Sequence, residues 1–212
     1  MFKSQMKCQK ILCLVALILA AVLFVYAIGF ITSFYDQLYF TFMGSYTHVD
    51  GADMFWEFQS VDEDGVRYGE LGFVDQLIYI AIVDIALALL LYITRTDKRR
   101  LYHIGNFVST GLFTGYNVGV AGWLMYKMWY FGDLYRMIDP VELEDMFNKW
   151  VVNRTFDYDA PLRTLALGYV IAALLILVGV AVALNLVWKI MLQKRENKML
   201  QTSSVQEVAV NG

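Results

Sequence analysis

The chain has 212 residues, of which 58% are hydrophobic and 16% aromatic, and its mean hydropathy is +0.50. This composition excludes an ordinary soluble domain, in which about 45–50% of the residues are apolar. The formal net charge of −3 leaves no basic excess for a nucleic-acid surface.

Four apolar runs are each long enough to cross a membrane, which takes about 20 residues of helix. They lie at about 11–33, 73–94, 104–130 and 162–188. Both prolines, Pro140 and Pro161, fall outside these runs. The sequence therefore predicts an all-α polytopic membrane protein, with one domain over residues 1–192 that forms a four-transmembrane-helix bundle.

Charge is distributed unevenly between the two sides of these runs. Basic residues gather in the first ten positions, in the short connection 95–103 and after the fourth run. The two long connections, 36–72 and 131–161, hold fifteen of the twenty carboxylates. Because basic flanks stay in the cytoplasm, we expect two extracytoplasmic loops and both termini inside a plasma membrane. The polar, unpatterned tail, 193–212, is predicted to be disordered.

The second run carries Asp84 near its middle and Asp75 at its outer end. The third run returns antiparallel after a short hairpin, so Asp84 is expected level with Asn117, and Asp75 level with Lys127. An unpartnered carboxylate at this depth costs at least about 2.5–3.5 kcal/mol. Two interpretations stay open for Asp84: a proton- or cation-binding site completed by Asn117, or a protonated acid that holds helices together. The bias of intramembrane polar groups toward packing favours the second.

Asp75 and Lys127 likewise have two interpretations. They form either a gate at an outer vestibule or an anchoring pair whose lysine reaches the headgroups. The anchoring role is favoured, because long cationic side chains near helix ends commonly extend to the interface.

The third run carries small residues on one face and polar residues on the other. The glycines are Gly111, Gly115, Gly119 and Gly122, and the polar residues opposite are Asn106, Thr110 and Asn117. This pattern predicts a central helix with neighbours on both faces. The glycine face fits either a partner helix or an interface inside the bundle, and the internal interface is favoured because the fourth run has a matching face. That face consists of Gly168, Ala172, Gly179 and Ala183.

The second long connection contains a predicted amphipathic helix. Asp139 suits its N-cap, Pro140 its first position, and Glu142 completes a variant of the capping box. The apolar face consists of Leu143, Met146, Phe147 and Trp150. Because the opposite face is acidic, we expect this helix to pack on the first loop or on a partner protein.

Signatures of enzymes are lacking in the sequence. His48 and His103 fall on opposite sides of the predicted membrane, and both cysteines, Cys8 and Cys13, lie at the cytoplasmic end of the first run. No metal cluster, nucleophile motif or phosphate-binding loop is recognisable. We therefore predict a non-enzymatic protein without a metal, a cofactor or catalytic residues.

Three segments carry a resemblance to a known family: KCQKILCLVALILAAVLFVYAIGF, RRLYHIGNFVSTG and NLVWKI. They resemble a family of four-span membrane proteins from Gram-positive bacteria, encoded near components of sugar ABC transporters. The resemblance covers the runs and the inner hairpin, and it brings no established activity and no site residues. It implies a bacterial plasma membrane and an association with transport.

Two functional hypotheses follow. The first is an accessory or assembly protein of a membrane complex, which presents an acidic, aromatic outer cap to a membrane-protein partner or forms a homo-oligomer. The alternative is a transporter or channel for ions or small solutes that uses Asp84 and Asn117 at the bilayer midplane.

Overall fold

A computed structural model describes residues 2–30, 72–95, 103–150 and 155–211. Within these residues the structure is helical and contains no strand. The helices are α1 (Phe2–Gly29), α4 (Phe73–Thr94), α5 (His103–Met137), α6 (Pro140–Trp150) and α7 (Asp159–Asn211). The predicted first outer loop, which includes His48, lies outside the described residues, except for its last residue, Gly72.

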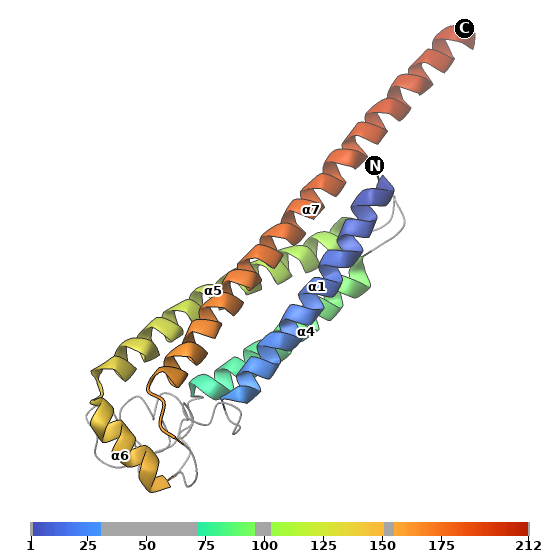
Figure 1. The fold of residues 1–212 in the computed structure, drawn as a ribbon. Coiled ribbons are helices and arrows are strands. Elements are labelled where there is room, and N and C mark those ends of the chain that lie inside the picture. The colour runs from blue at the N-terminus through green and yellow to red at the C-terminus, as the bar shows by residue number, and fades with distance from the viewer. Residues whose placement is uncertain (1, 31–71, 96–102, 151–154, 212) are drawn as a thin grey trace.

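Four of the helices, α1, α4, α5 and α7, form a bundle in which successive helices run in opposite directions (Figure 1). α1 packs against α4 and α7, and α5 packs against the same two helices. Both termini lie at one end of the bundle, here called the terminal end, and α7 projects beyond it. α6 lies at the opposite end, here called the loop end.

Each bundle helix buries one stripe of residues spaced three or four apart. On α1 this stripe runs along Cys13, Ala16, Ala20, Leu23 and Ala27. On α4 it runs along Leu77, Ala81, Asp84, Ala88 and Leu91. Small residues predominate at these positions, so the helix backbones approach closely, as in membrane bundles.

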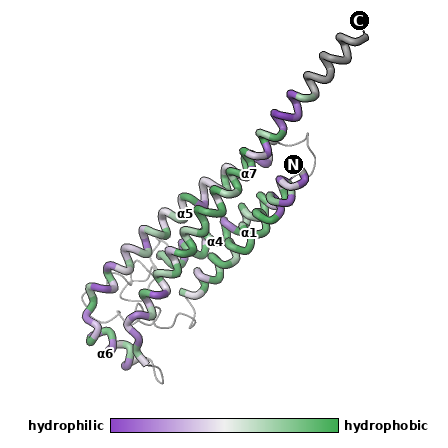
Figure 2. The backbone as a smooth tube through the Cα atoms, turned by 45° about the horizontal axis from the view of Figure 1, so that its top comes forward, coloured by the Kyte–Doolittle hydropathy of each residue, from purple (hydrophilic) through white to green (hydrophobic). Residues whose placement is uncertain are grey.

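The outward faces of the bundle are apolar. Exposed positions include large side chains such as Ile93, Leu177 and Leu184. Among the described residues, three helical segments are long and apolar enough to cross a membrane: Lys3–Gly29, Phe73–Thr94 and Asp159–Met199. Figure 2 shows hydrophobic residues along the middle of the bundle and alternating hydrophilic and hydrophobic residues along α6. α5 is less apolar because glycines and amides replace aliphatic side chains along it.

The helix bounds agree with the predicted runs in the middle of the bundle and differ at its ends. α4 coincides with the predicted run 73–94. α5 continues to Met137, into the predicted second loop. The disordered tail predicted for 193–212 is replaced by helix up to Asn211. Between Lys189 and Asn211 the chain has no proline or glycine and many good helix formers, so nothing interrupts the helix.

The start of α6 follows the predicted capping arrangement. The backbone N–H of Val141 donates to Oδ1 of Asp139 at 2.8 Å, which makes Asp139 the N-cap. Leu143 and Phe147 are buried, and the ring of Phe147 lies 5.7 Å from that of Phe156. The side chains of Met146 and Trp150, predicted for the same face, lie outside the described residues.

Replacing the cap residue, Asp139→Ala, is expected to weaken α6 by about 1 kcal/mol, because a helix N–H loses its acceptor. Amide hydrogen exchange over residues 141–148 checks this, and exchange there should quicken about five-fold. Asp145→Ala, on the exposed face of the same helix, is the matched control. Equal exchange in the two variants would contradict the capping role.

Candidate functional site

The middle of the α4–α5 interface holds a buried acid–amide pair. Nδ2 of Asn117 donates to Oδ1 of Asp84 at 2.9 Å, and each residue is only 1% exposed. The two residues therefore lie at the same level, as the residue count along the hairpin predicts. Ala81 and Ala88, on the same stripe of α4, are buried beside Asp84, and small residues there allow a neighbouring helix to approach closely.

This pair leaves two oxygen atoms without a donor. Nδ2 of Asn117 also donates to the carbonyl oxygen of Phe113 at 2.9 Å, so the amide nitrogen has both of its acceptors. Among the described residues, Oδ2 of Asp84 and Oδ1 of Asn117 are buried and have no hydrogen-bond partner. Each of these two oxygen atoms therefore lacks a donor, a costly arrangement in an apolar interior.

The side chains around the pair are tied to backbone carbonyls. The hydroxyl of Tyr116 donates to the carbonyl oxygen of Ile80 at 2.8 Å, which joins α5 to α4 a second time. The hydroxyl of Thr114 donates to the carbonyl oxygen of Gly179 at 3.1 Å and so joins α5 to α7. These bonds fix α5 between its two neighbours at the level of Asp84.

The glycine face of α5 points out of the bundle. Gly111, Gly115, Gly119 and Gly122 are exposed, and a Cβ atom added to any of them would meet nothing within 4 Å. The expectation that this face packs inside the bundle is therefore corrected, and so is the central position expected for the helix. The opposite, polar face is buried instead, because the amides need hydrogen-bond partners that only the bundle provides.

The small face of α7 does pack inside the bundle. Gly168, Ala172 and Gly179 are buried, and Ala183 is half-buried. A Cβ atom on Gly168 would lie 2.6 Å from the Tyr26 hydroxyl and closer still to Sδ of Met128. That hydroxyl donates to the carbonyl oxygen of Thr164 at 2.9 Å. Gly168 is therefore the point where α1, α5 and α7 meet.

A second polar group, not predicted from the sequence, is buried near the terminal end. Gln5 donates to Gln9 at 3.4 Å and to Asn185 at 3.4 Å, and Gln9 donates to Asn106 at 3.2 Å. Lys189, one turn beyond Asn185, is buried as well, at 4% exposed. This amide network links α1, α5 and α7 and gives the sequence-predicted Asn106 its partner.

The pattern of α1 contains a signal for this network. The buried stripe of α1, continued toward the N-terminus in steps of four residues from Cys13, reaches Gln9 and then Gln5. Both positions fall before the predicted start of the first run, so the apolar run alone does not include them. A polar residue on the continued apolar stripe of a helix is the feature that could have revealed them.

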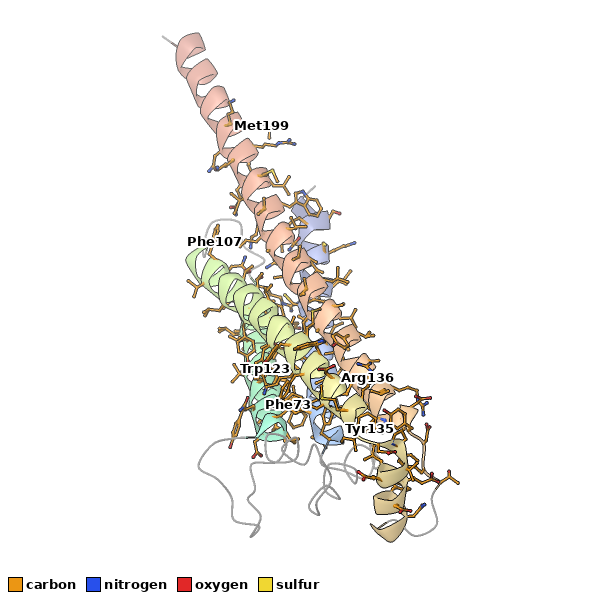
Figure 3. All side chains as sticks on the ribbon, turned by 90° about the vertical axis from the view of Figure 1, so that its left-hand side faces the viewer. Phe73, Phe107, Trp123, Tyr135, Arg136 and Met199 are labelled. Carbon is orange, nitrogen blue, oxygen red and sulfur yellow. The ribbon has the colours of Figure 1, made fainter. Side chains whose placement is uncertain are left out.

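Asp75 and Lys127 lie half-buried near the loop end. The ammonium of Lys127 lies 5.5 Å from the ring centroids of both Tyr130 and Phe131, within reach of a cation–π interaction. Phe73 and Trp123 stack beside this group, with centroids 5.4 Å apart (Figure 3). Two aromatic rings thus lie near the lysine ammonium, an environment typical of the membrane interface.

Long apolar helices, an apolar exterior and hydrogen bonds between buried polar side chains together define an integral helical membrane protein. Searches of protein-family models, curated proteins and solved structures found no match to this chain.

Proposed function

We propose that this chain is a non-enzymatic accessory protein of a membrane complex, which binds a helix of a partner membrane protein through the glycine face of α5. The observation that carries the proposal is the exposure of Gly111, Gly115, Gly119 and Gly122. Each glycine costs a helix about 0.5–1 kcal/mol relative to alanine. A glycine that faces lipid makes no packing contact that offsets this cost. A glycine that faces another helix allows the two backbones to approach closely.

The proposed topology has four spans, with α5 as the fourth membrane-crossing helix. α5 is long enough, and it packs against α4 and α7, both of which are apolar enough to cross a membrane. A helix between two spanning helices must cross with them. The terminal end carries the exposed lysines of α1 together with the exposed lysines and Arg195 of α7, which supports a cytoplasmic location for both termini.

The charge of α6 favours a different protein over a second copy as the partner. Asp139, Glu142, Glu144 and Asp145 are exposed on or beside α6, which follows α5 directly. Two copies in one membrane share the same orientation, so joining their α5 helices would bring two acidic α6 surfaces toward each other. A partner with a basic outer surface would instead attract this face. The association with a transport complex rests on the family resemblance.

Gly115→Leu tests the proposal in affinity purification of the tagged full-length protein from native membranes. The wild type should recover a stoichiometric partner, and Gly115→Leu should lose it, because the leucine keeps the helices apart. Ala173→Leu is the matched control, since Ala173 is an exposed small residue on α7. Both variants should keep the thermal stability of the wild type.

Three outcomes would overturn the proposal. They are recovery of the wild-type protein alone, retention of the partner by Gly115→Leu, and replacement of the partner by a second copy of this chain. Cross-linking of intact membranes through Gly115→Cys separates the last outcome from the others, because a second copy gives a product of twice the mass.

A further inference from the structure

The acid–amide pair of α4 and α5 lacks one hydrogen atom. If Asp84 were ionised, Oδ2 of Asp84 and Oδ1 of Asn117 would be two acceptors without a donor, and the carboxylate charge would lie in an apolar interior. One proton removes all three penalties. Carried on Oδ2 of Asp84, it makes the acid neutral and gives Asn117 a donor.

We propose that Asp84 and Asn117 form a proton-binding site inside the bundle. The bound proton resides on Oδ2 of Asp84 and is donated to Oδ1 of Asn117, while Nδ2 of Asn117 donates to Oδ1 of Asp84. Acid and amide thus close a ring with two hydrogen bonds. Binding adds one proton to a carboxylate, and no other bond forms or breaks.

The number of available oxygen atoms selects a proton over a metal cation. Calcium takes six to eight oxygen ligands, and sodium also needs several. The pair offers two, and the nearby carbonyls of Phe113 and Ile80 already accept hydrogen bonds from Asn117 and Tyr116. Two acceptors without a donor suit one shared proton and fall short of a metal shell.

The groups facing the pair include no cation among the described residues. Tyr116 of α5 is the nearby titratable side chain, and its hydroxyl is engaged by Ile80. α7 presents Gly179, where an added Cβ would lie 3.7 Å from Cβ of Asn117. On α1, the contact of Cys13 with the carbonyl of Leu91 puts Ala20 level with Asp84. An ionised Asp84 would therefore have no counter-ion there, whereas a neutral acid needs none.

The lysines that face the bundle interior lie far from the level of Asp84 and Asn117. Lys189 lies ten residues beyond Gly179 on α7, about 15 Å along the helix. The described lysines of α1 are Lys3, Lys7 and Lys10, at the terminal end. The proton site is thus electrically isolated in the bundle, and its occupancy decides whether the α4–α5 contact is neutral or charged. This inference is independent of the partner proposed for α5.

Infrared spectroscopy of the purified full-length protein detects the bound proton directly. At pH 7 the wild type should show the carbonyl stretch of a neutral carboxylic acid, and Asp84→Asn should abolish it. Asp75→Asn, which changes another acid of the same helix, is the matched control and should retain the band. Identical neutral-acid spectra for the wild type and Asp84→Asn would overturn the proposal.

Thermal unfolding provides the second measurement. Asp84→Asn replaces the acid with an amide that supplies the missing donor itself, so its Tm should equal or exceed that of the wild type. Asp84→Ala should lower Tm by about 5 °C, because Asn117 loses both hydrogen bonds to the acid. A proton bound by the folded state alone makes stability fall as pH rises, so the wild type should lose Tm toward high pH and Asp84→Asn should not.

Two results in this series would overturn the proton assignment. Equal loss of Tm in Asp84→Asn and Asp84→Ala would mean that a negative charge at Asp84 holds the helices together. If sodium in place of choline raised the Tm of the wild type but not that of Asp84→Asn, the site would be assigned to a metal cation.

Discussion

Gly168→Ala is expected to lower the free energy of unfolding by about 1–3 kcal/mol, the usual range for overpacking a buried contact. The added methyl group would lie within 2.6 Å of the Tyr26 hydroxyl and would also collide with Met128. To make room, Tyr26 has to give up its hydrogen bond to the carbonyl of Thr164 or α7 has to move away from α1 and α5. Thermal unfolding of the purified protein measures the loss, about 2–4 °C in Tm for each kcal/mol.

Gly179→Ala and Gly115→Ala are the matched controls for this prediction. At Gly179 the nearest atoms to an added Cβ lie 3.7 Å away, an ordinary packing distance, and at Gly115 nothing lies within 4 Å. Both variants gain helix propensity, so their Tm should stay level or rise. If Gly168→Ala were as stable as these two, the close meeting of three helices at Gly168 would be refuted.

Much of the architecture could be predicted from the apolar runs, because their length and composition reflect the width of a membrane. The ends of the helices could not. α1 begins at Phe2 and α7 reaches Asn211, since a helix continues through polar residues when no proline or glycine stops it and good helix formers follow. Hydropathy reports where a helix is apolar, and backbone propensity decides where it ends.

The two faces of α5 show what spacing can and cannot decide. The spacing correctly separates the glycines from Asn106 and Asn117, but it does not say which face points inward. Burial of the amides decides this, because unpaired amides are costly in an apolar environment whereas glycines have no polar side chain to satisfy. Given a choice between the two faces, the polar one was the better guide to the bundle interior.

The acid–amide pair was within reach of the sequence, whereas at the terminal end only the continued stripe of α1, and not the partners of Gln5 and Gln9, was within reach. A short hairpin fixes the relative depth of α4 and α5, so residue counting brings Asp84 to Asn117. Gln5, Asn106 and Asn185 come from three helices, α1, α5 and α7, joined by long connections. Their meeting depends on which helices are neighbours and how each is rotated, and the rotation of α1 is visible only once its stripe is followed to Gln5.

The largest single loss of stability is expected from Phe73→Ala, about 3 kcal/mol. The ring of Phe73 is 1% exposed at the loop end, and its centroid lies 5.0 Å from that of Phe131, 5.4 Å from that of Trp123 and 5.6 Å from that of Phe30. It therefore joins α4 to α5 and to the residue that follows α1. Because lipid is itself apolar, the stability lost in Phe73→Ala comes mainly from lost contacts and the cavity left behind, and less from transfer of the ring from water. The expected cost therefore lies near the low end of the range for Phe→Ala changes.

Trp129→Ala is the matched control for Phe73→Ala, because it removes an aromatic ring at the same end of the bundle from an exposed position on α5. The control should change Tm little, while Phe73→Ala should lower it by about 6–12 °C. Phe73→Leu should recover part of the loss, since it refills some of the cavity. Equal Tm values for Phe73→Ala and Trp129→Ala would mean that the helices hold together at the loop end without this aromatic cluster, and that the small-residue contacts around Asp84 and Gly168 carry the α4–α5 and α5–α7 interfaces.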